Sequence, residues 1–313
     1  MKAALAQIAP VLLDRKATTT KAIEAIKLAA SKGSSLVAFG ETFLPAYPLW
    51  ISRTNGARFD TQDQKELHAL YLQESVQIER GDLNPICSAA KENNIWVVIG
   101  IAEKPLDRGG HSIFASAVTI NNHGKIVSTH RKLMPTYEER LTWAPGDAHG
   151  LVAHECNEFR IGTLNCWENW MPLPRATLQA QGVNLHIAIW PGSVDNTKDI
   201  TRFVARESRS YVLSASTLIR ASDIPSNVPS RDRIVSDESE IIHNGGSAAA
   251  NPDGSWLLKP QPDIEDVFIV DLDRAFIDRE RQNFDPSGHY ARPELLKLSV
   301  DRTRQMNAEF IDK

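Results

Sequence analysis

Short apolar runs typical of buried strands alternate with longer segments of helical periodicity along most of the chain. Residues 17–30 repeat apolar side chains at the spacing of one helix face, and the Lys32-Gly33 pair that follows is a usual helix end. The same periodicity predicts helices over residues 63–77, 84–93, 174–181 and 197–209. Apolar runs predict strands at the start of the chain and over residues 35–39, 94–101, 159–165, 185–190, 211–218 and 266–270.

Two hairpins interrupt this alternation of helices and strands. The apolar segments 113–120 and 125–130 flank a turn in which Gly124 can adopt a positive φ angle. The second hairpin joins residues 247–251 to residues 257–258 through a turn that contains Gly254. The pattern therefore predicts an α/β fold whose sheet is not purely parallel and carries its helices on the outside.

No linker rich in glycine or serine divides the chain, and no break in composition does so either. We therefore expect one domain over residues 1–313, with residues 289–313 as a C-terminal tail. The polar segment 220–243 is the main irregular region. At this length, such a segment is more typical of a functional loop or lid than of a passive connection.

Composition and charge narrow the classes of function. Of the 313 residues, 42% are hydrophobic and 24% are charged, which is ordinary for a globular protein. The net charge of −4 gives no electrostatic reason to expect nucleic acid or an anionic membrane as a partner. No apolar run reaches the ~18 residues of a membrane span, and the opening residues become polar too soon for a secretory signal. Together with an odd count of three cysteines, these features favour a cytoplasmic location.

The three cysteines have different surroundings. They form no Cys-x-x-Cys pair, and no histidine lies beside them at zinc-ligand spacing, so no metal site is predicted. Cys87 lies in a helical pattern and is expected in the core, whereas Cys156 lies in a polar stretch without a grouped acid or base. Cys166 directly follows the strand over residues 159–165. Taken alone it would be a buried structural thiol, but this position also projects into the crevice where α/β proteins bind ligands.

Two charged residues also follow predicted strands. Glu41 comes after the apolar run Val37-Ala38-Phe39 and Gly40, where an unpaired carboxylate is costly to bury. Lys132 follows the strand of the first hairpin. Each could be a solvated charge at a strand end, but together with Cys166 they supply a base, a cation and a nucleophile at three strand ends.

The segments that carry these residues resemble the nitrilase superfamily of carbon–nitrogen hydrolases, and specifically its nitrilase branch. The resemblance rests on their order and spacing and covers nearly the whole chain. The carrying segments are residues 39–48, 130–141 and 164–173, with further matches at Trp190-Pro191-Gly192, Gly246-Ser247-Ala248 and Gly288-His289-Tyr290. One departure is Gly40, which precedes Glu41 where many relatives carry proline.

The resemblance implies a catalytic role for four residues. It makes Glu41 the general base, Lys132 the cationic stabiliser and Cys166 the nucleophile. Glu139 matches an additional glutamate that orients Lys132 or the attacking water, with the adjacent Glu138 as the alternative.

The resemblance also implies substrate-pocket residues. Trp167 and Glu168 are expected to shape the pocket and to hold the turn after Cys166, and Tyr47 and Trp190 to present aromatic walls. Trp50 and Trp143 could do the same, although plain core packing explains any of these aromatic residues equally well. His130 is expected to be a supporting residue at a strand end.

The implied activity is hydrolysis of an organic nitrile to the carboxylic acid and ammonia through a covalent cysteine intermediate. An amidase or another carbon–nitrogen hydrolase with the same triad is the alternative, including one that hydrates a nitrile or cyanide only to the amide. A non-catalytic scaffold would not require the triad. The resemblance further implies a four-layer α-β-β-α sandwich, no cofactor, a small-molecule nitrile substrate, and a homodimer or larger homo-oligomer.

Overall fold

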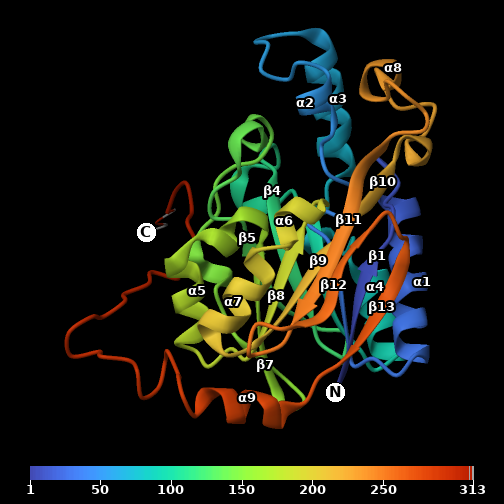
Figure 1. Ribbon diagram of the computed structural model, residues 1–313. Helices are drawn as coiled ribbons and strands as arrows, with labels where there is room; N and C mark the ends of the chain where they lie inside the picture. The colour runs from blue at the N-terminus through green and yellow to red at the C-terminus, as the bar shows by residue number, and fades with distance from the viewer. Residues whose placement is uncertain (310, 312–313) are drawn as a thin grey trace.

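The computed structural model describes residues 1–309 and 311, and its centre is a pair of sheets packed face to face (Figure 1). In the first sheet, the strand order is β13-β1-β2-β3-β4-β5. Strands β1, β2 and β3 run parallel, while β4, β5 and β13 are antiparallel to their neighbours. The bounds are β1 Lys2–Gln7, β2 Leu36–Phe39, β3 Trp96–Glu103, β4 Phe114–Ile120, β5 Ile126–Arg131 and β13 Asp266–Asp271.

The second sheet also has a parallel centre and antiparallel margins. Its order is β10-β11-β9-β8-β7-β6, with β12 paired to β11, and β7, β8 and β9 are parallel. The bounds are β6 His154–Cys156, β7 Phe159–Asn165, β8 Leu185–Trp190, β9 Tyr211–Ser216, β10 Leu218–Arg220, β11 Ile241–Ala250 and β12 Trp256–Pro262. The expectation of a mixed sheet with outer helices is therefore confirmed. The strands form two such sheets and not one.

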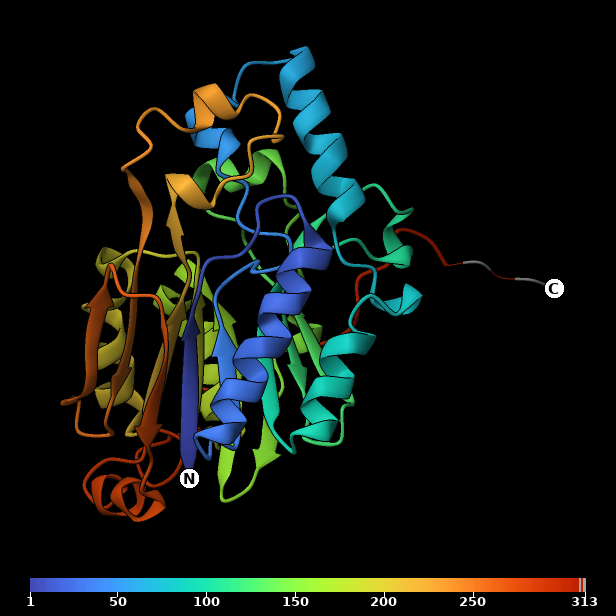
Figure 2. The same ribbon diagram turned by 90° about the vertical axis from the view of Figure 1, so that its right-hand side faces the viewer.

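Helices cover the outer face of each sheet. Figure 2 shows α1 (Arg15–Ser31) and α4 (Asn84–Glu92) over the first sheet, and Figure 1 shows α5 (Pro172–Gln179) and α7 (Ile200–Ser208) over the second. The layers are thus α-β-β-α, as the resemblance implied. The other described helices are α2 Trp50–Arg53, α3 Gln62–Glu74, α6 Val194–Thr197, α8 Arg231–Ile234 and α9 Arg274–Arg281, with 3₁₀ turns at Ile78–Arg80, Leu106–Arg108, Tyr137–Leu141, Ala148–Gly150, Cys166–Trp170 and Ala221–Asp223.

The strand residues alternate between two cores. On β2, Leu36 and Ala38 face the second sheet, whereas Val37 and Phe39 face α1 and α4. Because both faces of each central strand are buried, these strands are continuous apolar runs instead of alternating ones.

Three local predictions differ from the structure. The helix predicted over residues 197–209 is two helices, α6 and α7, which are separated at Lys198 and Asp199. The strand predicted over residues 211–218 is interrupted at Thr217. Cys156, placed in a polar stretch, lies fully buried in the short edge strand β6, which the pattern did not reveal.

The segment 220–243 is partly ordered. It contains a 3₁₀ turn and α8 before it joins β11, and it lies beside α2, with Arg53 paired to Glu240. After α9, the described residues up to 309 form turns and extended chain without a helix or strand. None of the described helices is both long and apolar enough to cross a membrane.

Candidate active site

Three strand ends from the two sheets converge on one buried site. Glu41 follows β2, and Lys132 follows β5 of the same sheet. Cys166 follows β7 of the second sheet. The end of β2 is joined directly to the second sheet, because the Glu41 N–H donates to the Trp190 carbonyl at 3.0 Å. A Cβ at Gly40 would lie only 2.7 Å from that carbonyl oxygen, so glycine permits this close approach.

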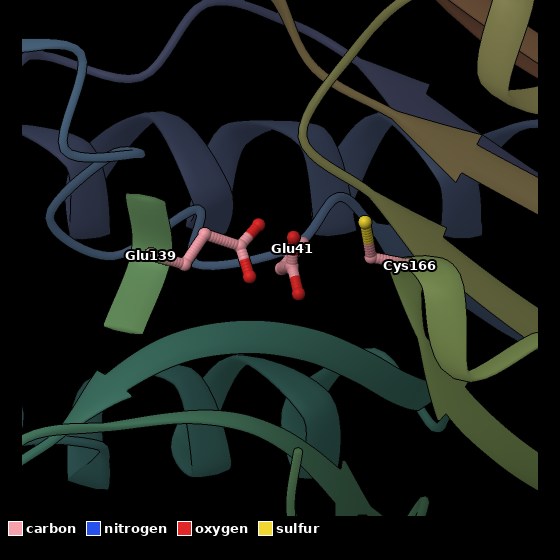
Figure 3. A group of neighbouring side chains, drawn as sticks. All are labelled: Glu41, Glu139 and Cys166. Carbon is pink, nitrogen blue, oxygen red and sulfur yellow. The ribbon is translucent and has the colours of Figure 1, made fainter. Parts of the chain in front are cut away.

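The four residues assigned to catalysis lie together. Lys132 Nζ is 2.9 Å from Glu41 Oε1 and 2.6 Å from Glu139 Oε2, so the ammonium bridges two carboxylates. The Cys166 sulfur, one oxygen of Glu41 and one oxygen of Glu139 lie within 4.8 Å of one another. Figure 3 shows the Glu41 carboxylate between Glu139 and Cys166. Lys132 and Glu41 have no exposed surface, and Cys166 is 2% exposed.

Cys166 occupies a sharp turn. Its φ angle is +50°, a left-handed conformation that residues other than glycine seldom adopt, and it begins the 3₁₀ turn Cys166–Trp170. Such strain at a nucleophile is typical of a turn that aims a side chain out of a strand end. The backbone here is held by Glu168, whose carboxylate accepts from the Asn165 N–H at 2.8 Å.

Glu139 is oriented by its own short helix. Its Oε2 accepts from the Thr136 N–H at 2.6 Å, which completes a capping box, and its Oε1 accepts from the Tyr47 hydroxyl at 3.1 Å. The two contacts fix the carboxylate that faces Lys132. The structure thus brings Glu139 to the site, while Glu138 stays half-buried beside it.

Burial and neighbouring charges alter the ionisation of the cluster. Burial, reinforced by the charge of Glu139 and opposed by that of Lys132, raises the pKa of Glu41 to about 8. Burial and the charge of Glu41 raise the pKa of the Cys166 thiol above its usual value, and Lys132 opposes this shift. Burial alone would lower the pKa of Lys132, but its anionic neighbours outweigh burial and raise it. The lysine therefore stays cationic, and Glu41 is a stronger base than an exposed carboxylate.

Glu168 and His130 form a second buried pair. His130 Nε2 lies 3.0 Å from Glu168 Oε2, and the Leu133 N–H donates to Glu168 Oε1 at 2.5 Å. One carboxylate therefore joins the segment that carries Lys132 to the turn that carries Cys166. This geometry supports the expected roles of His130 and Glu168 in holding the strand ends, and it leaves little of the Glu168 carboxylate for a substrate.

The aromatic candidates take different positions. Tyr47 lies edge-on to Trp143 with ring centroids 5.5 Å apart, and the Lys132 ammonium lies 5.6 Å from the Trp143 ring centroid. Trp190 is fully buried beside Cys166, and Trp167 is about half exposed. Trp50 packs on Tyr71 with ring centroids 5.0 Å apart, as part of the core under α2 and α3.

His243 is a neighbour of the site that the sequence did not single out. Its ring lies 5.5 Å from that of Tyr47, and its Nδ1 lies 2.7 Å from the Pro191 carbonyl oxygen. Burial lowers its pKa to about 4, so the ring is neutral near pH 7. The residue ends a segment predicted to be a loop, so no periodic pattern distinguished it.

Comparisons with known proteins agree with this geometry. The family model for carbon–nitrogen hydrolases matches residues 2–282. A prokaryotic protein named nitrilase 2 is 35% identical, with 98% of this chain and 95% of that protein covered. An aliphatic nitrilase of Rhodococcus rhodochrous is 31% identical over 99% of this chain and 82% of that protein, and an arylacetonitrilase of Aspergillus oryzae is 33% identical over 96% and 91%.

Solved structures share the fold. A carbon–nitrogen hydrolase of Helicobacter pylori superposes with a TM-score of 0.69 at 18% identity, over 95% of this chain and 99% of that one. A variant of an amidase from Nesterenkonia superposes with a TM-score of 0.62 at 16% identity, over 90% and 95%. With the family match over most of its length, this chain belongs to the carbon–nitrogen hydrolases of the nitrilase superfamily.

Proposed function

We propose that this protein is a nitrilase that converts an organic nitrile to its carboxylic acid and ammonia. The observation that carries the proposal is the sealed cluster in which Lys132 bridges two carboxylates beside the Cys166 thiol. The relatives that match nearly the whole chain at 30–35% identity are named nitrilases, which favours a nitrile over an amide as the substrate.

In the first step, Glu41 removes the thiol proton as the Cys166 sulfur attacks the nitrile carbon. The raised pKa of Glu41 suits this transfer, because it brings the pKa of the base closer to that of the thiol. Negative charge develops on the nitrile nitrogen, and the Lys132 ammonium stabilises it at a place closed to water. The nitrogen then takes the proton from Glu41, which leaves a covalent thioimidate.

In the second half, water adds to the thioimidate carbon with Glu41 again as the base. The tetrahedral carbon then bears hydroxyl, amino and thioether groups. The hydroxyl proton passes to the amino group as the carbon–nitrogen bond breaks, so ammonia leaves and a thioester remains. A second water releases the carboxylic acid and restores the thiol. Loss of the thiolate instead of ammonia would release the amide, so the acid-to-amide ratio reports which group leaves.

The test is turnover of phenylacetonitrile, benzonitrile and the matching amides by the parent protein and by Cys166→Ala. We expect acid and ammonia from at least one nitrile, and a loss of roughly 10⁴-fold or more without the nucleophile. Cys156→Ala is the matched control, because it also removes a buried thiol but lies in β6 and should keep its kcat.

Other outcomes of this experiment would reassign the function. Turnover of amides alone would make the protein an amidase, and release of amide alone would make it a nitrile-hydrating enzyme. An inactive parent whose thermal stability depends strongly on Cys166 would favour a scaffold.

We also propose that the protein forms a homodimer through an apolar surface near the site. Five large side chains of the Cys166–Trp170 turn, Met171, α5 and α7 are between 37% and 62% exposed, and we call them the aromatic patch: Trp167, Trp170, Met171, Leu173 and Phe203. Large exposed apolar side chains on adjoining elements favour an interface. The three free thiols in turn favour a reducing compartment such as the cytoplasm.

A further inference from the structure

The segment over residues 302–305 contacts the loop that carries Gly146, Asp147 and His149, and we call this segment the strap. The Arg304 guanidinium lies 2.9 Å from Asp147 Oδ1, and the Gln305 N–H donates to Asp147 Oδ2 at 3.1 Å. His149 Nδ1 also lies 3.1 Å from the Arg302 carbonyl oxygen. More than 150 residues of chain separate the partners of each contact, so the strap joins the end of the chain to its middle.

The loop under the strap supports the backbone of Lys132. Gly146, the residue before Asp147, donates its N–H to the Lys132 carbonyl at 2.7 Å. A Cβ at Gly146 would lie 2.3 Å from the Arg131 carbonyl oxygen, so the loop is pressed against the end of β5. On the other side, the Lys132 N–H donates to the Ala115 carbonyl at 2.8 Å. The peptide groups of the lysine are thus held by β4 on one side and by the loop on the other.

Asp147 is the group through which the strap acts on this loop. Its side chain is 5% exposed, and its Oδ1 also accepts from the His149 N–H at 3.1 Å. Burial raises its pKa, but the Gln305 N–H and the Arg304 charge outweigh burial and lower it. Without the strap, a nearly buried carboxylate one residue from Gly146 would lose its main cation and would move toward water.

The strap itself adds little to the core. A cavity of about 400 Å³ lies between it and the edge strand β5, lined by residues 126–129, His149, Gly150, Val152, Arg302 and Arg304. Its contacts with the loop are polar, and Arg304 remains 22% exposed. Removing one of these contacts should therefore alter the loop without unfolding the sheets.

We infer that Asp147 and Arg304 are positioning residues, which hold Lys132 against Cys166 and Glu41 by clamping the loop at Gly146. This inference rests on the proposed role of Lys132 in stabilising charge at the nitrile nitrogen and beside the thiolate. A displaced lysine should lower kcat more than it raises KM, because the charge that Lys132 is proposed to stabilise develops only in the transition state.

The experiment compares Arg304→Met, Asp147→Asn and their combination in the full chain. We expect kcat to fall about tenfold in each single variant with KM changed less than about twofold, and the double variant to fall no further. Alkylation of Cys166 by iodoacetamide should slow in parallel, and Arg304→Lys should restore most of both rates. Arg302→Met is the matched control, because it removes a neighbouring strap cation that does not pair with Asp147.

The kcat is expressed per folded chain, with the folded fraction measured by circular dichroism, so that misfolded protein does not count. Unchanged kcat and alkylation in Arg304→Met and Asp147→Asn would overturn the inference, and so would equal losses in Arg302→Met. A loss that disappears on this normalisation would show a structural role only. An inactive parent would refute the proposed function, whereas the alkylation rates would still test the clamp.

Discussion

Each catalytic side chain has its chemistry set by a small number of contacts. Glu41 accepts no well-directed hydrogen bond from the described residues, and burial raises its pKa more than Lys132, 2.9 Å away, lowers it. Glu139 differs from Glu41, because its oxygens accept hydrogen bonds from the Thr136 N–H and the Tyr47 hydroxyl. These contacts support different proposed roles for the two carboxylates around the Lys132 ammonium, with Glu41 exchanging protons and Glu139 holding the lysine.

This division predicts a specific effect of Glu139→Gln on pH dependence. The charge of Glu139 raises the pKa of Glu41, so its removal should lower that pKa below about 8. Because the reaction needs ionised Glu41, the acid limb of the kcat/KM profile should move to lower pH, while kcat falls roughly 10- to 100-fold as the lysine loses a partner.

The adjacent Glu138→Gln is the control for this experiment, since it removes one negative charge that does not contact Lys132. Its profile should match that of the parent. An acid limb in Glu139→Gln that stays in place, or that moves to higher pH, would contradict the assignment of Glu41 as the base.

At the scale of elements, local pattern predicted most helices and strands, and long-range contacts explain the breaks. The helix expected over residues 197–209 is broken after Thr197, whose hydroxyl donates to the Gly246 carbonyl on β11 at 2.6 Å. The strand expected over residues 211–218 breaks where the Thr217 hydroxyl bonds the Pro191 carbonyl. Neither partner lies close in the sequence, so no local periodicity could reveal either break.

The segment after β2 crosses close to β3 at Gly100, and this crossing predicts the effect of Gly100→Ala. An added Cβ would lie 2.3 Å from the Gly40 carbonyl oxygen and 2.4 Å from the Thr42 nitrogen, both backbone atoms. We expect a loss of about 2–3 kcal/mol in the free energy of unfolding, and a fall in kcat because Glu41 must move. Denaturant titration and kinetics measure the two effects.

Gly109→Ala serves as the comparison, because nothing lies within 4 Å of its added Cβ. Its φ of +71° alone should cost about 1 kcal/mol, with kcat unchanged. If Gly100→Ala were no more harmful than this variant, the close crossing would not hold Glu41.

At the scale of the whole molecule, the sequence predicted the strand ends that carry the site but could not show how they meet. Glu41, Lys132 and Cys166 were each identifiable at the end of an apolar run, and the family resemblance supplied their roles. Which sheet each strand joins depends on pairing between distant segments, such as β1 with β13. The bridge through Glu168 and the strap over Asp147 likewise depend on contacts across the fold, so they were visible only in the structure.

The aromatic patch predicts the oligomeric state. We expect the parent to have twice the mass of one chain by light scattering, and Leu173→Arg with Phe203→Arg to shift it to a monomer, because buried guanidinium groups would lack partners. Leu106→Arg replaces an apolar side chain of similar exposure outside the patch and should stay dimeric. A monomeric parent, or a dimer that survives the paired substitution, would place the interface elsewhere or remove it.

The division of the site between two sheets has a consequence for heating. The proposed base Glu41 and Lys132 follow strands of the first sheet and the proposed nucleophile Cys166 follows a strand of the second, and mostly apolar side chains lie between the two sheets. A slide of one layer past its neighbour by about an ångström would leave every helix and strand intact and still separate sulfur from carboxylate. On warming, turnover should therefore be lost at a lower temperature than the melting transition seen by circular dichroism. Activity would then report the alignment of the two layers more sensitively than the secondary structure does.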